Sequence, residues 1–522
     1  MVAPAAAAPP LRRLPRRCCT AAPAAALLLC AAQLAQLPAR ALCQAPPNAT
    51  LLQLNASDAL CLDGRPAYVY VSLAPRPSDT WVLNFGASPT LAMCIDLRSC
   101  LAARAYMAAQ AAPPASLQLA GWGVQSRDCA DNPDFCDANH VLFPIGAFAP
   151  GCDMGLLVSQ EDLAVNASLS LRFRGPQILA AAIAALVGEG GGGPMAGARH
   201  VLLTGVTFGG MAAVLAADLV QAQLARALPA PLQRFGVLPV DAIHPRYYSM
   251  VWMAWGDFFT DSWLTPAFQF LANVTGGPAA QPASPALRAC AAGGLPPWQC
   301  LYLNASLPHV SAPLFLIQQM GAVWDFQCAY EGAAPTDSLM QVQCSKSSST
   351  YERYYTCVQY PDLCSAAIVA NFSIPLQRVY SAYANASALA PGKGRGGGYF
   401  LHSCYLGVYS LSGRGNTSVW NIISVGGVTM REAVSTWWAS GGNNSAPMLY
   451  HDSLWNASGV PPAAAGTELL PEGVGEYHHH GGGGGSGESG APRPGDGLGA
   501  PIVPPWTSRY FTNPTCRGFP WY

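Results

Sequence analysis

The stretch His200-Val201-Leu202-Leu203-Thr204-Gly205-Val206-Thr207-Phe208-Gly209-Gly210 decides the fold of this chain. Its first five residues are mainly apolar and predict a buried strand. Residues 211 to about 228 are rich in alanine and predict a helix. Glycines flank Thr207 between these two segments and permit a sharp turn. The sequence therefore predicts a strand, a tight turn and a helix, with a hydroxyl group at the corner of the turn.

This order of elements is that of the nucleophile elbow of α/β-hydrolases, where the serine of a G-x-S-x-G motif faces the substrate. Thr207 occupies the position of that nucleophile. Further buried strands are predicted at residues 81–85 and 313–317, and a helix is predicted after Pro176. Strands that alternate with helices predict an α/β fold with a mainly parallel sheet covered on both faces. We expect disulfide-linked loops around it.

Composition and charge exclude several classes of function. The chain has 522 residues, a formal net charge of −1 and only 11% charged residues, with no basic stripe, which argues against nucleic acid as a partner. No spacing of Cys and His is typical of a zinc site, so we expect neither a metal nor a cofactor. Residues 478–480 are three histidines that either bind metal loosely or belong to a solvated low-complexity tract, and the second interpretation is favoured.

The N-terminus has the pattern of a secretory signal. Arginines lie between residues 12 and 17, an apolar stretch is centred on residues 24–29, and Ala39-Arg40-Ala41 offers a cleavage site. An uncleaved anchor is the alternative, because residues 18–37 are almost long enough to span a bilayer. We expect cleavage, and therefore no membrane contact of the mature chain.

Cysteines and sequons also predict secretion, to the extracellular space or the cell wall. Three of the 18 cysteines lie in the leader, and most of the remaining 15 are expected to pair, with one free or intermolecular. Cys94/Cys100 and Cys357/Cys364 are expected to close local loops. Ten N-x-S/T sequons predict a glycosylated surface. They begin at Asn48, Asn55, Asn166, Asn273, Asn304, Asn371, Asn385, Asn416, Asn443 and Asn456.

The sequence divides into five segments. They are a signal peptide at 1–41, a glycosylated lead-in at 42–57, an α/β-hydrolase domain at 58–460, a Gly/Pro-rich low-complexity insertion or linker at 461–505, and a C-terminal segment at 506–522 that contains Cys516.

Short motifs follow one another in order between residues 58 and 516. They are Cys61-Leu62-Asp63-Gly64, Asn132-Pro133-Asp134-Phe135, Phe173-Arg174-Gly175, Asp241-Ala242, the pair Cys357 and Cys364, Ser403-Cys404, Arg431-Glu432-Ala433-Val434 and Asn513-Pro514-Thr515-Cys516. Through them the chain resembles the plant pectin acetylesterases, a secreted α/β-hydrolase family that also contains the Notum carboxylesterases.

The resemblance implies a Ser/Asp/His triad that removes acetyl groups from cell-wall pectin. In this chain it places the nucleophile at Thr207, the acid at Ala322 and the base at Gly407, and the oxyanion region near Gly86 and Phe208 is also altered. A threonine without a base is a poor nucleophile, and its methyl group crowds the approach of an ester. Because losing one triad member already costs several orders of magnitude in rate, we predict a non-catalytic protein.

Such a protein is expected to bind a cell-wall polysaccharide or a secreted protein in its vestigial cleft. Tryptophans either stack on sugars or belong to the core, and the core is favoured for each of Trp122, Trp252, Trp255, Trp263, Trp298 and Trp324. The alternative is an active carbohydrate O-acetylesterase with a rewired set of Thr207, His402 and Asp325. Structural or surface roles are expected for His140, His200, His244, His309 and His451. A third hypothesis, removal of a lipid from a protein as by Notum, requires the same triad.

Overall fold

A computed structural model describes eleven segments of the chain, all within the compact unit Pro46–Tyr522. They are residues 48–86, 93–110, 112–119, 123–145, 152–244, 264–276, 282–319, 397–402, 413–414, 417–441 and 448–451. The signal peptide expected at 1–41, the insertion at 461–505 and the C-terminal segment at 506–522 lie outside the described residues.

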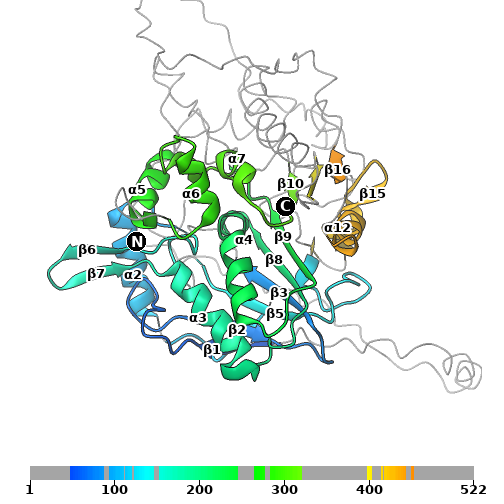
Figure 1. The fold of residues 1–522 in the computed structure, drawn as a ribbon, viewed down its shortest axis with the longest axis horizontal. Helices are drawn as coiled ribbons and strands as arrows, with labels where there is room; N and C mark the ends of the chain where they lie inside the picture. Colours follow the sequence, from blue (N-terminus) through cyan, green and yellow to red (C-terminus); the bar gives the residue numbers. More distant parts are fainter. Residues whose placement is uncertain are drawn as a thin grey trace, which may run out of the picture. The chain divides into compact units, whose positions relative to one another are not determined.

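A ten-stranded sheet runs through the centre of the molecule in the order β16-β11-β10-β9-β8-β3-β5-β2-β1-β4 (Figure 1). Its strands are β1 Asn48–Gln53, β2 Tyr68–Ser72, β3 Thr80–Phe85, β4 Ser116–Gln118, β5 Asn139–Phe143, β8 His200–Val206, β9 Arg234–Val240, β10 Phe315–Gln319, β11 Gly398–His402 and β16 Met448–His451. All neighbours from β5 to β16 pair in parallel, whereas β4, β1, β2 and β5 pair antiparallel. The predicted mainly parallel sheet is confirmed.

Three two-stranded hairpins and several helices surround this sheet. The hairpins are β6 Asp162–Asn166 with β7 Leu169–Arg172, β12 Gly413–Arg414 with β13 Thr417–Ser418, and β14 Ser424–Val425 with β15 Val428–Thr429. The helices are α2 Leu97–Ala109, α3 Gly175–Val187, α4 Phe208–Ala227, α5 Leu264–Gly276, α6 Pro285–Ala292, α7 Leu303–Ser306, α11 Val419–Ile422 and α12 Met430–Ala439. Short 3-10 turns occur at Gly123–Gln125, Glu189–Gly191, Gln299–Leu301 and Leu307–His309.

Helices cover both faces of the sheet, because alternate residues of each buried strand face opposite sides. On β8, Val201 and Leu203 join the core cluster that packs against α3 and α4. Leu202 belongs to the other cluster, which packs against α12 through Trp437 and Trp438. An α/β fold with helices on both faces is therefore confirmed.

Helix α4 is the core helix of the fold. Its length and hydropathy would suffice to cross a membrane, but 72% of its most apolar window is buried within the fold. Its residues pack against β8, β9 and α3 (Figure 1). The strand and helix predicted on either side of Thr207 are thus present as β8 and α4, and the helix predicted after Pro176 is α3, with the proline in its first turn.

The segment that the sequence sets apart as a lead-in, residues 42–57, contributes to the sheet. Strand β1 pairs with β2 along Thr50–Gln53 and with β4 along Asn48–Thr50. The side chain of Ala49 is fully buried. The folded domain therefore begins before residue 58. This strand is short, so its alternation of buried and exposed residues covers too few positions to distinguish it from an irregular tail in the sequence.

Four disulfides are present in the described segments. They are Cys61–Cys152, Cys94–Cys100, Cys129–Cys136 and Cys290–Cys300. The predicted local bridge between Cys94 and Cys100 is confirmed, while Cys357 and Cys364 lie outside the described residues. Cys129 and Cys136 lie close to Asp137 in an arrangement that could hold a metal, but their disulfide leaves no thiolate to bind one.

Candidate active site

Thr207 lies at a sharp corner between β8 and α4. Its backbone has φ 51° and ψ −122°, which β-branched residues adopt only under strain. The N–H of Thr207 donates to the carbonyl of Val240 at 2.8 Å, and its own carbonyl accepts from the N–H of Met211 at 2.9 Å. The sequence-predicted elbow is therefore present as a backbone conformation.

The glycines around the elbow are required by close backbone contacts. A Cβ on Gly205 would lie 2.4 Å from the backbone of Gly209. A Cβ on Gly209 would lie 2.4 Å from the carbonyl oxygen of Phe85 at the end of β3. Only glycine allows α4 to begin so close to the two strands, which explains the pattern Gly-x-Thr-x-Gly in physical terms.

The hydroxyl group of Thr207 is buried without a hydrogen-bond partner among the described residues. The residue is 8% exposed, and its Oγ1 neither donates nor accepts a hydrogen bond there. A nucleophilic hydroxyl needs a base within about 3 Å to remove its proton. In the described part of the chain, no imidazole stands in that relation to Thr207.

The end of the neighbouring strand β9 is the second corner of the site. Val206 pairs with Val240, so Thr207 and Asp241 follow side by side. Asp241 also has a positive φ, 49°. Its N–H donates to the carbonyl of Ile317 at 2.9 Å, and its Oδ1 accepts from the N–H of Gln319 at 3.0 Å. These bonds fasten the corner to β10.

His244 lies beside the elbow, and sequence reasoning missed it. Its ring packs on Phe208, with 4.8 Å between ring centroids, and the residue is 5% exposed. The side chain of Gln318 holds the preceding residue, since its Oε1 accepts from the N–H of Ile243 at 3.0 Å. The only sequence signal is that His244 follows the Asp241-Ala242 motif by two residues. The imidazole of His244 therefore lies against Phe208, the residue that follows Thr207.

His402 ends β11 and is fully buried. Its ring lies 6.3 Å from that of Phe400, and burial lowers the pKa of His402 to about 3. Its imidazole is therefore neutral at neutral pH.

The sheet register keeps His402 away from the elbow. Val206 pairs with Val240, which pairs with Ile317, which pairs with Phe400. Three interstrand spacings, roughly 14 Å, therefore separate the strand ends that carry Thr207 and His402. The structure does not bring these two residues together, and Asp325, the third member of the rewired set, lies outside the described residues.

The other predicted site positions are only partly described. Ala322 and Gly407 lie outside the described residues. The N–H of Gly86 donates to the carbonyl of Phe143 at 2.8 Å, so this amide is already used within the sheet. Phe208 begins α4, and the first N–H groups of a helix have no partners within it. Of the predicted oxyanion region, Gly86 is therefore not placed to donate its N–H to a ligand, and Phe208 lies at the N-terminus of α4.

The remaining histidines and the candidate tryptophans are described only in part. His140 is 1% exposed in β5, and burial together with the nearby charge of Arg127 lowers the pKa of His140 to about 3. Burial likewise lowers the pKa of His200. Trp298 packs edge-on against Tyr302 at 6.4 Å between ring centroids. The other five candidate tryptophans lie outside the described residues.

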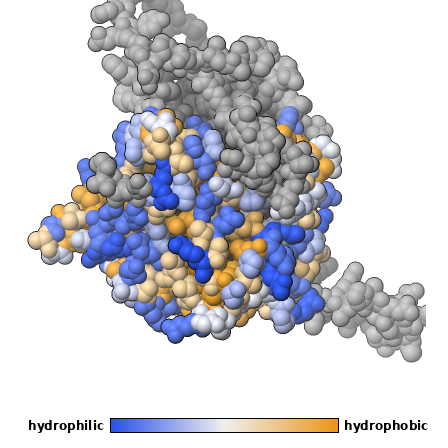
Figure 2. Space-filling model, in the orientation of Figure 1, coloured by the Kyte–Doolittle hydropathy of each residue, from blue (hydrophilic) through white to orange (hydrophobic). Residues whose placement is uncertain are grey.

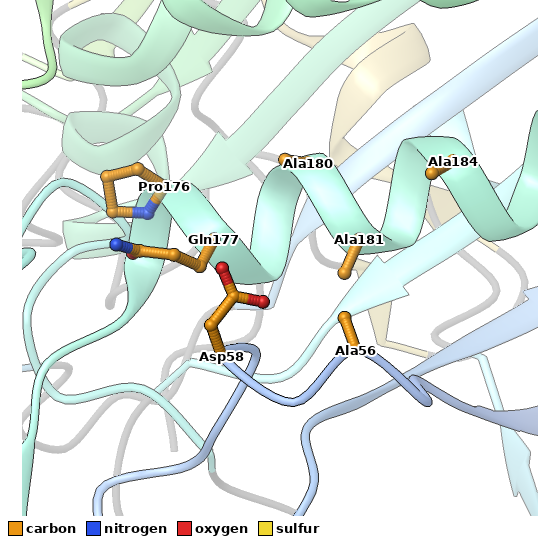
Figure 3. Close-up of a pocket in the computed structure, with 7 residues that line it drawn as sticks. All are labelled: Ala56, Asp58, Pro176, Gln177, Ala180, Ala181 and Ala184. Atoms are coloured by element: carbon orange, nitrogen blue, oxygen red, sulfur yellow. The ribbon is translucent and has the colours of Figure 1, made fainter.

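A shallow cavity of about 400 Å³ lies elsewhere, between α3 and the loop after β1 (Figure 3). It is lined by Ala56, Asp58, Pro176, Gln177, Ala180, Ala181 and Ala184. Hydrophobic residues also gather on the surface over α3 and α4, between hydrophilic clusters (Figure 2). Neither Thr207 nor His402 lines this cavity, so it is separate from the elbow.

Comparison with known proteins relates the N-terminal part of the chain to one family. Residues 43–231 match the family model described as Pectinacetylesterase. Two crystal forms of the Wnt deacylase Notum from Drosophila are similar to the chain at 19% and 18% identity. Each alignment covers 77% of this chain and 97% or 100% of the other, with a TM-score of 0.49. No protein with a curated description matches the sequence.

Proposed function

We propose that the chain is a secreted, non-catalytic member of the pectinacetylesterase family, whose model matches residues 43–231, and that it binds a cell-wall polysaccharide or a secreted protein. This proposal and its alternatives all start from a domain of the esterase family. Secretion is supported by the signal pattern at residues 1–41 and by four disulfides, which form and persist in oxidising compartments.

The orphaned hydroxyl of Thr207 carries the proposal. Acyl transfer by a hydroxyl nucleophile requires an imidazole to take its proton and a carboxylate to orient that imidazole. The Oγ1 of Thr207 is buried and has no hydrogen-bond partner in the described segments. At the aligned acid and base positions the sequence has Ala322 and Gly407, neither of which titrates. An elbow in this state supports binding of an acylated ligand without its hydrolysis.

One observation favours the alternative, an active carbohydrate O-acetylesterase with a rewired site at Thr207. The elbow keeps the strained backbone of a nucleophile, and His244 packs on the adjacent Phe208. If a loop movement turned this imidazole towards Oγ1, the chain would regain a general base. Within the described residues, His244 is better placed for that role than His402.

Hydrolysis assays separate the two proposals. The secreted chain and its Thr207→Ser and Thr207→Ala variants are assayed with p-nitrophenyl acetate and with acetylated pectin. We expect all three proteins to match the rate in buffer, because a hydroxyl without a base is not activated. Activity in the native chain that disappears in Thr207→Ala would instead establish the rewired esterase. His244→Gln and His402→Gln, compared side by side, would then identify its base.

Binding is measured on the same proteins. Retention on immobilised acetylated pectin, with de-esterified pectin as the matched control, tests the polysaccharide ligand. We expect retention of the native chain, and the same retention of Thr207→Ala, because the hydroxyl takes no part in chemistry. Equal elution from both matrices at the void volume would leave a secreted protein as the ligand class.

A Notum-like removal of lipid from a protein is the third hypothesis. It needs the same nucleophile, base and acid, so the orphaned hydroxyl of Thr207 argues against it equally. A long-chain ester such as p-nitrophenyl octanoate, assayed beside the acetate, checks it. Turnover of the octanoate alone would favour this hypothesis over the polysaccharide.

A further inference from the structure

The nine asparagines of the described segments fall into two groups. Five belong to N-x-S/T sequons, and the side chains of all five are exposed: Asn48, Asn55, Asn166, Asn273 and Asn304. The other four are not exposed: Asn84, Asn132 and Asn139 are 6%, 1% and 5% exposed, and Asn421 is half-buried. Solvent exposure therefore divides the asparagines in the same way as the sequon motif does.

The side-chain nitrogens of three of the four asparagines outside sequons donate hydrogen bonds. The Nδ2 of Asn132 donates to the carbonyl of Ser126, and that of Asn139 to the carbonyl of Ser78, both at 2.9 Å. The Nδ2 of Asn421 donates to Asp131. Among the described residues, the Nδ2 atoms of the five sequon asparagines donate to no protein group. Among the nine described asparagines, this nitrogen is both exposed and without a protein acceptor only in the sequons.

Asn166 shows this geometry in detail. It ends β6 at the turn of the β6–β7 hairpin, which projects from the body of the fold (Figure 1). Its Oδ1 accepts from the N–H of Ser168 at 2.9 Å and lies 3.0 Å from the Ser168 hydroxyl, which donates to it. The amide oxygen is therefore held inward by the hydroxyl residue of the same sequon. The amide nitrogen is left to solvent.

Asn48 and Asn55 present a similarly open arrangement. Along β1 the burial alternates, so Asn48 and Thr50 are exposed while Ala49 between them is fully buried. In the loop after β1, Asn55 and Ser57 are both exposed. A sugar on either asparagine would extend into solvent without displacing any core side chain.

The two helical sequons differ in one respect. Asn273 on α5 and Asn304 on α7 are exposed, but Thr275 is 3% exposed and Ser306 is fully buried. The Thr275 hydroxyl donates to the carbonyl of Leu271 at 2.8 Å. Because the transferring enzyme must read the hydroxyl residue of the sequon, these two sites are open to it only before their helices fold.

From this division we propose that the chain carries N-linked glycans at Asn48, Asn55, Asn166, Asn273 and Asn304. The donor is a lipid-linked oligosaccharide diphosphate. A bond forms between Nδ2 and the anomeric carbon, the bond from that carbon to the diphosphate oxygen breaks, and the amide proton passes to a base of the transferring enzyme. The inference rests on the secretion part of the proposed function and is independent of catalysis.

The test reads each asparagine separately. The full chain with a C-terminal affinity tag is expressed in cultured eukaryotic cells and recovered from both medium and cell lysate. Peptide N-glycosidase in water enriched in oxygen-18 converts each glycosylated asparagine to labelled aspartate, which peptide mass spectrometry locates. We expect label at the five sequon asparagines and at none of the other four described asparagines.

Variants that keep the asparagine supply the matched controls. Thr50→Ala, Ser57→Ala and Ser168→Ala each break one sequon and should remove one glycan, whereas Thr50→Ser, Ser57→Thr and Ser168→Thr should keep it. For the helical sites, Asn273→Gln and Asn304→Gln are used because the hydroxyl residues are packed. Each of these two should also remove one step from the mobility of the chain on a gel.

Two failures are distinguishable. A chain with its signal removed and its disulfides formed, but with no label at the three open sequons, overturns the glycan inference and leaves the proposed secretion standing. A chain with an intact signal, free thiols and no label overturns both. The esterase and pectin-retention assays do not enter either result, so they decide the non-catalytic proposal by themselves.

Discussion

The ends of strands β8 and β9 lie side by side and share an unusual backbone conformation, but their side chains differ in how they are bonded. Both leave the sheet through a residue with positive φ, Thr207 at 51° and Asp241 at 49°. The carboxylate of Asp241 accepts from the N–H of Gln319. The hydroxyl of Thr207 has no hydrogen-bond partner among the described residues. The strain at Asp241 is accompanied by a bond that stabilises it, and the strain at Thr207 is not.

This difference separates a structural corner from a functional one. Aspartate tolerates a left-handed backbone because its short polar side chain bonds locally, so Asp241 contributes to its own geometry. Thr207 is β-branched and is held there by its surroundings, namely the glycines of the elbow and the carbonyl of Val240. Strain without local compensation is typical of positions that once served chemistry or binding.

The largest expected effect is at Asp241. Asp241→Ala leaves the buried N–H of Gln319 without its acceptor and places a residue with a Cβ but no polar group at positive φ. We expect the free energy of unfolding to fall by about 2–4 kcal/mol, measured by urea denaturation. Asp241→Asn keeps an oxygen acceptor and tolerates this backbone, so it should lose less than half as much. Equal losses of unfolding free energy in both variants would contradict a structural role of the Asp241 side chain at this corner.

A third strand end, that of β11, carries His402, whose contribution to stability depends on pH. Burial lowers the pKa of His402 to about 3, below its unfolded value near 6.5. Between these values the unfolded chain binds a proton that the folded chain does not, so stability present above pH 6.5 is lost as the pH falls. The loss from this residue approaches about 1.4 kcal/mol per pH unit. In His402→Gln, the acid slope of the unfolding free energy should decrease by that amount.

His140 supplies the matched control for this slope. Burial also lowers the pKa of His140 to about 3, in strand β5, which lies on the opposite side of β8 from β11. His140→Gln should reduce the acid slope as His402→Gln does. Asp153 has the opposite pH dependence. Burial raises the pKa of Asp153 to about 6, so its contribution to the free energy of unfolding increases as the pH falls from about 6 to 4. An unchanged slope in both histidine variants would contradict the burial of neutral imidazoles.

The smallest effect sharpens the comparison most directly. Thr207→Val replaces the orphaned hydroxyl by a methyl group of similar shape and should raise the free energy of unfolding by about 1 kcal/mol, because a buried unbonded hydroxyl is destabilising. Thr204→Val is the control in the same strand, since the Thr204 hydroxyl donates to the carbonyl of Leu238 at 2.8 Å. It should lower stability by about 1 kcal/mol. Destabilisation by Thr207→Val would reveal a partner for its hydroxyl.

Much of the fold could be predicted from local sequence. The apolar run before Thr207 and the alanine-rich stretch after it are β8 and α4, and Pro176 begins α3, because hydrophobic period and proline placement act over a few residues. The sequence does not distinguish strand β1 from a lead-in, since a short strand is defined by its pairing with β2 and β4. The Cys94–Cys100 bridge was predictable because only six positions separate the two residues.

The candidate site was predictable in one corner only. Thr207 is marked by its flanking glycines, whereas His244 carries no motif and becomes visible only because its ring packs on Phe208. The rewired pair of Thr207 and His402 looked feasible in sequence, but the strand order places two strands between their own. The acid and base positions at Ala322 and Gly407 stay sequence predictions, because they lie outside the described residues.

The sequence by itself determined the elbow, the parallel α/β character and the sequons, because glycine, alanine and N-x-S/T patterns act through neighbours along the chain. Only the tertiary structure decided that the Thr207 hydroxyl is buried without a partner, that Asp241 is fastened to β10, and that every described sequon asparagine is exposed. Burial and hydrogen bonding between strand ends depend on residues far apart in sequence, so local pattern carries no information about them.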